Sequence, residues 1–417
     1  MTTPTATTSP AHAAATGPAA DAPDRRAWLM LTLATLGFAL NFWAWALLSP
    51  LGPHFKTALK LSSFNQALLV AVPVVVGSLG RIPIGALTDR FGGRVMMPAV
   101  SFVTVLPVLF LGYLGHDSLA AILVGGFFLG IGGTAFAVGI PFVNAWFPPA
   151  KRGFALGIFG AGMGGTAISA LSTVKLVDHH GVSTPFLIVA CVLAAYGVLA
   201  ALVLRDAPGR VAPTTSALSR LRETVKLRIT WQASAMYAVG FGGYVAFSVY
   251  LPTYLKTAYS LTQADAANKM AGFVLVAVAM RPIGGWLSDR ISPTRVLGIA
   301  FTVVTAFALV QSATPALAPT GTIAFLSMAA ALGLASGAVF ALVAQRAPAN
   351  RVGAVTGVVG AAGGLGGFIP PLFMGSVYGH TGSYAGGLVA LAVVAAAAVA
   401  YDMGRIGRRT ESEARHV

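Results

Sequence analysis

Long apolar segments alternate with short polar segments along almost the whole chain. Each apolar segment has 18 or more residues, which is enough for a helix to cross the hydrocarbon layer of a membrane, roughly 30 Å thick. The twelve segments lie at residues 28–50, 66–88, 95–115, 119–146, 153–176, 184–204, 230–256, 269–288, 295–313, 320–346, 351–378 and 383–404. This pattern predicts an all-α membrane protein with twelve transmembrane helices.

Composition agrees with a lipid environment. The 417 residues are 56% hydrophobic and 9% charged, whereas about a quarter of the residues in a soluble domain are charged. Residues 1–24 are rich in Ala, Thr and Pro without an apolar run, so we expect a disordered tail. The first apolar segment is too long for a cleaved signal region. We expect two membrane domains at 25–204 and 230–404, a linker at 205–229 and a second tail at 405–417.

The net charge of +15 has two interpretations, nucleic-acid binding or membrane topology. Twenty of the 27 Lys and Arg residues lie in one alternating set of loops and tails, and six of these lie between Arg205 and Arg228. This asymmetry is typical of the positive-inside rule. It predicts a multi-pass protein of the cell inner membrane with both termini and the linker in the cytoplasm, in contact with lipid and not with nucleic acid.

Few residues suggest chemistry other than transport. The single cysteine, Cys191, excludes an intramolecular disulfide and a cysteine metal cluster. We find no histidine cluster that suggests a metal, no phosphate-binding loop for ATP, and no constellation of catalytic residues. We therefore expect a protein without cofactor or metal that is not an enzyme.

The two predicted halves repeat at a constant offset of 200 residues. RIPIGALTDR, which begins at Arg81, matches RPIGGWLSDR, which begins at Arg281, at the Arg, Gly, Leu, Asp and Arg positions. Glycines in GIFGAGMGG and GVVGAAGGLGG, which begin at Gly157 and Gly357, match at the same offset. Internal repeats of this kind are typical of transporters with a binding site between the halves. The pattern predicts two pseudo-symmetric six-helix bundles.

Arg81 and Arg281 are the most informative residues. Each lies eight positions before a loop aspartate, which at 1.5 Å per residue is roughly 12 Å inside the membrane. Burying such a charge costs on the order of 3 kcal/mol or more. None of the twelve Asp and Glu residues falls inside a predicted helix core, so a structural ion pair is disfavoured. We infer that the missing partner is a transported anion held between the two halves. Two arginines alone do not distinguish nitrate from phosphate esters.

GALTDRFGGR, from Gly85 to Arg94, resembles the signature of the loop between helices 2 and 3 in the major facilitator superfamily. The related segment GWLSDRISPTR lies between the predicted helices 8 and 9. The resemblance implies the major facilitator fold. We assign gating and packing roles to Asp89, Arg90, Asp289 and Arg290.

The two glycine-rich segments resemble the signatures of the nitrate/nitrite porter family. That resemblance implies a substrate site with Arg81 and Arg281 as the anion-binding pair. The further substrate-binding candidates are Tyr237, Phe241, Phe136, Met163, Gly164, Gly360 and Gly364. One position departs from the family pattern, because Met163 replaces an asparagine and offers no amide to a substrate oxygen.

We therefore predict a secondary transporter of a small inorganic oxyanion, nitrate or nitrite or both, that works as a monomer by alternating access. A transporter of another anion, such as a carboxylate or an organophosphate, and an exporter of drugs or metabolites remain alternatives. A membrane sensor or structural protein is less consistent with the short loops. The predicted membrane core has no Asp, Glu or His to carry a proton, which favours anion exchange.

Overall fold

The computed structural model describes residues 25–210, 217–348 and 351–401, and all regular elements in these ranges are helices. Both predicted tails, residues 1–24 and 405–417, fall outside the described residues, and the last predicted span, 383–404, is described up to residue 401. The first half comprises α1 (Arg25–Trp45), α2 (Leu48–Ala58), α3 (Ser63–Leu79), α4 (Arg81–Phe91), α5 (Gly93–Tyr113), α6 (Leu119–Leu129), α7 (Ala135–Trp146), α8 (Pro149–Gly160), α9 (Gly165–His180) and α10 (Ser183–Val203), with short 3-10 turns η1 (Gly130–Thr134) and η2 (Ala161–Gly164).

The second half has fewer interruptions. After α11 (Ala217–Thr224) come α12 (Arg228–Tyr259), α13 (Gln263–Ile291), α14 (Pro293–Ser312), η3 (Leu317–Gly321), α15 (Thr322–Arg346), α16 (Val352–Gly366), α17 (Ile369–Thr381) and α18 (Ala385–Tyr401). Eleven spans in the described ranges are long and apolar enough to cross a membrane, and α18 is an apolar helix with 17 described residues. The predicted twelve-helix architecture is confirmed.

Five of the observed spans are broken into two helices. α1 and α2, α3 and α4, α6 and α7, α8 and α9, and α16 and α17 are the five pairs, and each pair forms one span. Glycines lie at four of these breaks, and glycine is a poor helix former. At the fifth, between α1 and α2, residues 46 and 47 form a turn. After α16, Pro370 and Pro371 lack the N–H groups that the carbonyl oxygens four residues earlier would need, so the helix restarts as α17.

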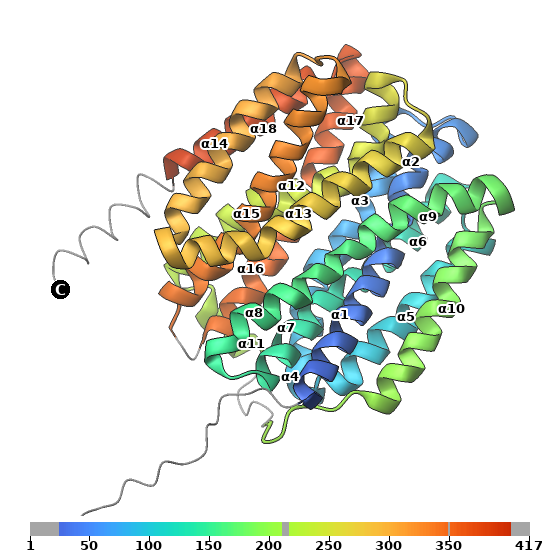
Figure 1. Cartoon of the computed structure of the whole chain (residues 1–417). Coiled ribbons are helices and arrows are strands. Elements are labelled where there is room, and N and C mark those ends of the chain that lie inside the picture. The colour runs from blue at the N-terminus through green and yellow to red at the C-terminus, as the bar shows by residue number, and fades with distance from the viewer. Residues whose placement is uncertain (1–24, 211–216, 349–350, 402–417) are drawn as a thin grey trace, which may run out of the picture.

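The two halves form separate bundles that lie side by side (Figure 1). α1 to α10 form one bundle and α12 to α18 the other, and the interface is formed mainly by α2, α3 and α9 against α12, α13, α16 and α17. Ser49 Oγ donates a hydrogen bond to the carbonyl oxygen of Val249, 2.9 Å away. These two positions are 200 residues apart, so equivalent residues of the repeat meet at the interface.

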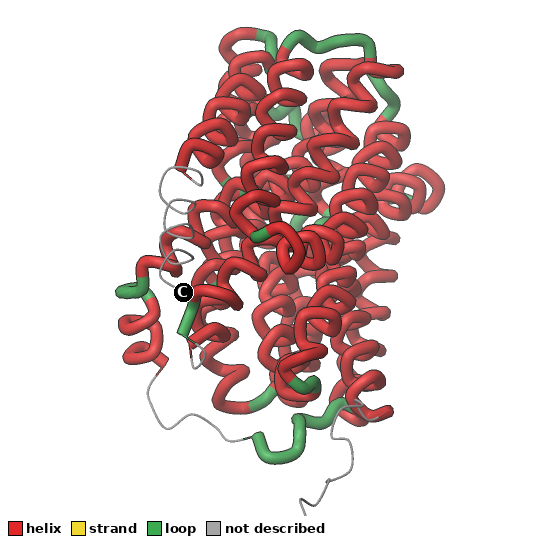
Figure 2. The backbone as a smooth tube through the Cα atoms, turned by 60° about the vertical axis from the view of Figure 1, so that its left-hand side comes forward, coloured by secondary structure: helices red, strands yellow, loops and turns green. Residues whose placement is uncertain are grey.

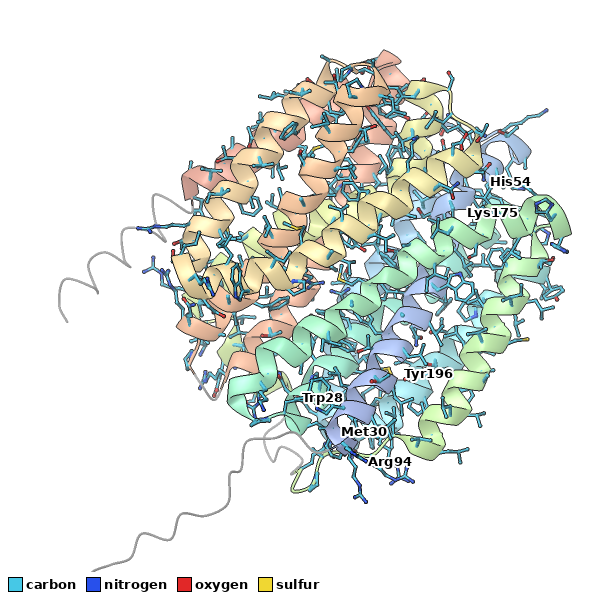
Figure 3. All side chains as sticks on the ribbon, in the orientation of Figure 1. Trp28, Met30, His54, Arg94, Lys175 and Tyr196 are labelled. Atoms are coloured by element: carbon cyan, nitrogen blue, oxygen red, sulfur yellow. The ribbon has the colours of Figure 1, made fainter. Side chains whose placement is uncertain are left out.

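The bundle has two ends, which we name by the connections that lie there. The linker end carries residues 205–210 and α11, and the distal end carries the α9–α10 and α12–α13 connections (Figure 1). Figure 2 shows loops at both ends of the bundle. Figure 3 places Trp28 and Arg94 at the linker end and His54 and Lys175 at the distal end.

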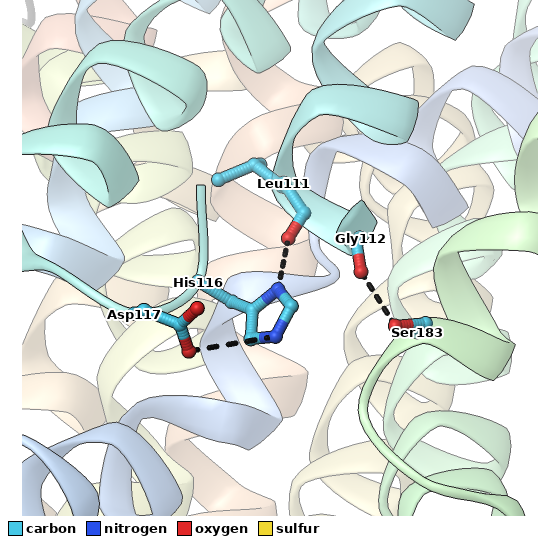
Figure 4. A network of polar contacts seen from close by, with 5 residues as sticks. All are labelled: Leu111, Gly112, His116, Asp117 and Ser183. Carbon is cyan, nitrogen blue, oxygen red and sulfur yellow. Dashed lines mark hydrogen bonds and ion pairs between the residues drawn. The ribbon is translucent and has the colours of Figure 1, made fainter. Parts of the chain in front are cut away.

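At the distal end, polar contacts fix the termini of two helices (Figure 4). His116 Nδ1 lies 3.1 Å from the carbonyl oxygen of Leu111, and Ser183 Oγ donates to the carbonyl oxygen of Gly112 at 2.6 Å. The last carbonyl groups of α5 thus find partners in the next loop and at the start of α10. His116 also lies 3.6 Å from the carboxylate of Asp117.

Close packing against α15 sets the position of α13. A Cβ atom at Gly337 would collide with the carbonyl oxygen of Arg281. Small residues let helix backbones approach each other closely in membranes. Gly337 therefore allows the backbone of α15 to pack directly against the backbone of α13 at Arg281.

Candidate functional site

Arg81 and Arg281 are buried at the interface between the halves. Arg81 is the first residue of α4, directly after the break at Gly80, and Arg281 lies inside α13. The two residues are 5% and 8% exposed, and each side chain reaches across to the opposite half. The arrangement agrees with the facing positions that the repeat predicts.

The two arginines find different partners across the interface. Arg81 Nη1 donates a hydrogen bond to the carbonyl oxygen of Gly360 in α16, 2.6 Å away. Arg281 Nη1 contacts the sulfur of Met163 in η2, and its Nη2 donates to the hydroxyl of Tyr237 in α12 at 2.6 Å. Because arginine has no acceptor, the Tyr237 hydroxyl accepts this bond and its own proton is free to be donated elsewhere.

Both guanidinium groups lie against the same two aromatic rings. The Arg81 Cζ atom is 4.8 Å from the centroid of Phe136 and 5.5 Å from that of Phe241. The corresponding Arg281 distances are 5.9 and 5.4 Å. Phe136 and Phe241 are stacked, with centroids 6.4 Å apart and planes 17° from parallel. These ring faces attract the cations and help to compensate for their burial.

Charge compensation is nevertheless incomplete. Within residues 25–210, 217–348 and 351–401, no carboxylate lies at ion-pairing distance from Arg81 or Arg281. The Arg81 Nε atom is buried without a hydrogen-bond partner in the same ranges. Two buried positive charges with an unused donor form a site that an anion would stabilise.

The remaining predicted site residues fall into two groups. Tyr237, Phe241, Phe136 and Met163 are buried and directly contact one or both arginines. Met163 therefore faces the interface between the halves and not lipid.

The three glycines differ in their surroundings. An added Cβ at Gly360 would lie 3.3 Å from Phe136 and 3.9 Å from Arg81 Nη1, and at Gly164 it would meet nothing within 4 Å. Gly364 packs against Ser78 of α3, where a Cβ would collide with the hydroxyl. The structure thus brings Gly360 to the arginines, whereas Gly364 lies in a helix contact.

The sequence reasoning missed two features of the site. Phe340 of α15 lies 4.8 Å from Tyr237, centroid to centroid, and 5.8 Å from Arg281 Cζ. Nothing in the repeat indicates it. Tyr244 stacks on Phe241 at 5.8 Å, and it could have been found because it continues the face of α12 that carries Tyr237 and Phe241.

The predicted gate residues lie at the linker ends of α4 and α13. The guanidinium groups of Arg90 and Arg290 stack on Phe91 and Trp286, at 5.2 and 4.2 Å. Arg210 Nη2 donates to the carbonyl oxygen of Asp89 at 2.6 Å. Asp289 is exposed. The gating role of Asp89, Arg90, Asp289 and Arg290 stays a prediction.

Comparisons with known proteins identify relatives along most of the chain. Residues 34–371 match the Major Facilitator Superfamily. The probable nitrate/nitrite transporter NarK2 of Mycobacterium tuberculosis is 49% identical over 375 residues, which cover 89% of this chain and 94% of that protein. The nitrite extrusion protein of Bacillus subtilis is 36% identical over 373 residues, which cover 89% and 93%.

A solved structure shows the same fold. A bacterial homolog of the human lysosomal transporter Spinster, inward-facing and unoccupied, superposes with a TM-score of 0.69 at 20% identity, covering 91% of this chain and 97% of that one. The chain therefore belongs to the major facilitator superfamily and, within it, to the nitrate/nitrite porter family.

Proposed function

We propose that this protein transports nitrate, nitrite or both across the cell inner membrane by alternating access, with the anion bound between Arg81 and Arg281. One observation carries the proposal: two buried arginines from opposite halves share the Phe136 and Phe241 rings and have no carboxylate partner among the described residues. The names of the relatives support the choice of anion.

The donor geometry suits a small planar oxyanion. A guanidinium group offers paired N–H donors in one plane. An entering anion would replace the Gly360 carbonyl on Arg81 and the Met163 sulfur on Arg281, which are weaker partners than a negative charge. The free proton of Tyr237 would supply a further donor. The flat rings of Phe136 and Phe241 favour a flat ligand over a bulky one.

Binding at this place would couple the anion to the motion of the halves. Each arginine belongs to one half and touches the other, so an anion that binds both would hold the two bundles together. This is the arrangement that alternating access around a midplane site requires. Because both arginines come from one chain, we propose that the monomer is the transporting unit.

The proposed orientation rests on the basic residues. The set of loops and tails with twenty of the 27 Lys and Arg residues includes Arg94, which Figure 3 places at the linker end, and Arg210, which binds the backbone of Asp89 there. By the positive-inside rule the linker end and both termini face the cytoplasm. The distal end then faces the other side of the inner membrane.

We propose exchange of anions as the mode of transport. Without an anion the two arginines repel each other; for any two unit charges about 8 Å apart, an effective dielectric near 20 gives a repulsion of roughly 2 kcal/mol. Return of the empty carrier is therefore less favourable than return with a bound anion, which favours exchange of nitrate for nitrite. No Asp, Glu or His among the described residues forms an ion pair or hydrogen bond with either arginine, so none of them offsets this repulsion or offers a proton-carrying group beside the pair.

Equilibrium binding tests the proposed substrate. Calorimetric titration of the purified protein with nitrate and nitrite should give saturable binding, and acetate, a phosphate ester and chloride should compete weakly. A carboxylate or an organophosphate that binds more tightly than both nitrogen oxyanions would establish the alternative anion transporter. Saturable binding of an uncharged drug with no response to nitrate would establish the exporter.

A further inference from the structure

Beyond the arginine pair, a hydroxyl pair crosses between the two halves on the distal side of the site. Tyr244 lies on α12 three residues after Phe241, and Thr166 is the second residue of α9, three residues after Met163. Their hydroxyl oxygens are 3.2 Å apart, and the side chains are 1% and 0% exposed. The pair therefore adjoins both the aromatic and the sulfur contacts of Arg281.

The direction of this hydrogen bond follows from the neighbours. Thr166 Oγ1 donates its single proton to the carbonyl oxygen of Met163, 3.0 Å away. A hydroxyl has one proton and two acceptor lone pairs, so Tyr244 must be the donor to Thr166. The contact is thus a phenol of the second half bound to a threonine of the first half.

Further polar contacts between the halves continue toward the distal end. Ser49 Oγ donates to the carbonyl oxygens of Ser248 and Val249, both at 2.9 Å, and Gln66 Nε2 donates to Thr253 Oγ1 at 3.0 Å. Ser49, Gln66 and Thr253 contribute their side chains to these contacts, and Ser248 and Val249 contribute their backbone carbonyl groups. All five residues are at most 3% exposed. The distal part of the interface therefore contains a buried seam of hydroxyl, amide and carbonyl groups.

A polar seam suits a contact that must open repeatedly. Separating hydrogen-bonded groups into water has a small net cost for each bond, because water replaces the lost partner. Separating an apolar contact would instead expose surface at about 25 cal/mol for each Å². Once Tyr244 is released from Thr166, its proton can also be donated to an oxyanion that leaves the arginines.

We infer that Tyr244 and Thr166 form the inner gate of the distal half of the transport path, the first contact that must break for an anion to leave the arginines toward the distal end. This inference rests on the proposed transport function. The inference adds Tyr244 and Thr166 to the residues of the site, and it assigns the function to their hydroxyl groups.

The test measures opening at the distal end without any anion. In a Cys191→Ser background, a reporter Ser248→Cys is placed one helical turn beyond Tyr244. Reaction of the reporter with a membrane-impermeant thiol reagent is followed in right-side-out and inside-out vesicles, so that each end is examined separately. Tyr244→Phe and Thr166→Val each remove one partner of the hydrogen bond.

We expect each variant to raise the labelling rate from the distal side about fivefold, which corresponds to one net hydrogen bond of about 1 kcal/mol. The double variant should label no faster than either single variant, because both remove the same bond. Tyr250→Phe is the matched control. It lies on the same helix in a groove lined only by residues of α12, α17 and α18, and it should leave the rate at the wild-type value.

Unchanged labelling in both single variants would overturn the inference, and so would an equal increase in Tyr250→Phe. Additive effects in the double variant would show that the two hydroxyls act independently and would also overturn it. Because no anion is present, the result separates the gate from the identity of the substrate. A protein that fails to bind nitrate or nitrite in calorimetry but shows the expected labelling pattern would refute the proposed substrate and retain the gate.

Discussion

Replacing Arg81 or Arg281 with lysine separates the charge of the site from its geometry. Lysine keeps the positive charge but has a compact ammonium group in place of the planar fork. The Arg281 guanidinium contacts Tyr237 and Met163 while its face lies 5.4 Å from the Phe241 centroid. A single ammonium on a shorter stem cannot keep all of these contacts and also offer paired donors to an oxyanion.

The expected loss follows from the number of charge-assisted hydrogen bonds. Each lysine variant loses at least one such bond to the anion, worth about 1.5–3 kcal/mol. At 1.4 kcal/mol for each factor of ten, nitrate should bind roughly 10- to 150-fold more weakly to either variant. Because we propose that the anion bridges both residues, we expect the double variant to show no saturable binding.

Calorimetric titration of purified variants with nitrate gives the affinity, and size-exclusion chromatography shows whether each one folds. Arg295→Lys is the matched control, since Arg295 is exposed near the linker end and should not affect binding. Wild-type nitrate affinity in a folded Arg81→Lys or Arg281→Lys variant would refute the assignment of that arginine as a substrate ligand.

Three further predictions concern the surroundings of the arginines. Met163→Asn should fold and bind nitrate or nitrite more tightly in calorimetry, because an amide beside Arg281 can donate to the anion; lower thermal stability with unchanged affinity would contradict this. Gly337→Ala should lower stability by about 1–3 kcal/mol and weaken nitrate binding, because the new methyl group displaces the Arg281 backbone; a wild-type melting temperature would count against it. Nitrate uptake into proteoliposomes should require internal nitrite, and rapid uptake with internal acidification into anion-free vesicles under an imposed proton gradient would reject exchange.

The sequence alone predicted the helices well because the physical signal for them is strong. A membrane span must be long and apolar, and all of the predicted spans overlap described helices. The arginine pair was predicted for a related reason, since a charge in an apolar segment is costly and stands out. The repeat then related Arg81 to Arg281 and predicted that they face each other.

Contacts within the site were harder to predict, because nearly every side chain in such helices is apolar and periodicity does not distinguish a core face from a lipid face. Phe340 has no equivalent aromatic residue in the first half, where Ile140 occupies that position. Gly364 matches the glycine signature but packs on Ser78, which only the helix arrangement reveals. The Tyr244 and Thr166 contact depends on how the halves meet.

The two halves have diverged where they hold the arginines, and the packing explains why. Arg81 is held by a backbone carbonyl, whereas Arg281 is held by the side chains of Met163 and Tyr237. The position equivalent to Met163 is Gly363, where a Cβ atom would collide with the Tyr237 ring. A larger residue at 363 would therefore displace a partner of Arg281, so the repeat cannot be symmetric at this point.

This asymmetry determines which arginine has surroundings that side-chain substitutions can change. The hydrogen bond from Arg81 to the Gly360 carbonyl does not depend on a side chain, so point substitutions change it little. The surroundings of Arg281 are set by two replaceable side chains. We therefore expect changes in anion preference to concentrate at Met163 and Tyr237. Titration with nitrate and nitrite tests this expectation on a panel of substitutions at Met163 and Tyr237. A panel at Ser78, beside Gly364, is the control. A larger change in the nitrate-to-nitrite affinity ratio at Ser78 than at Met163 and Tyr237 would refute the expectation.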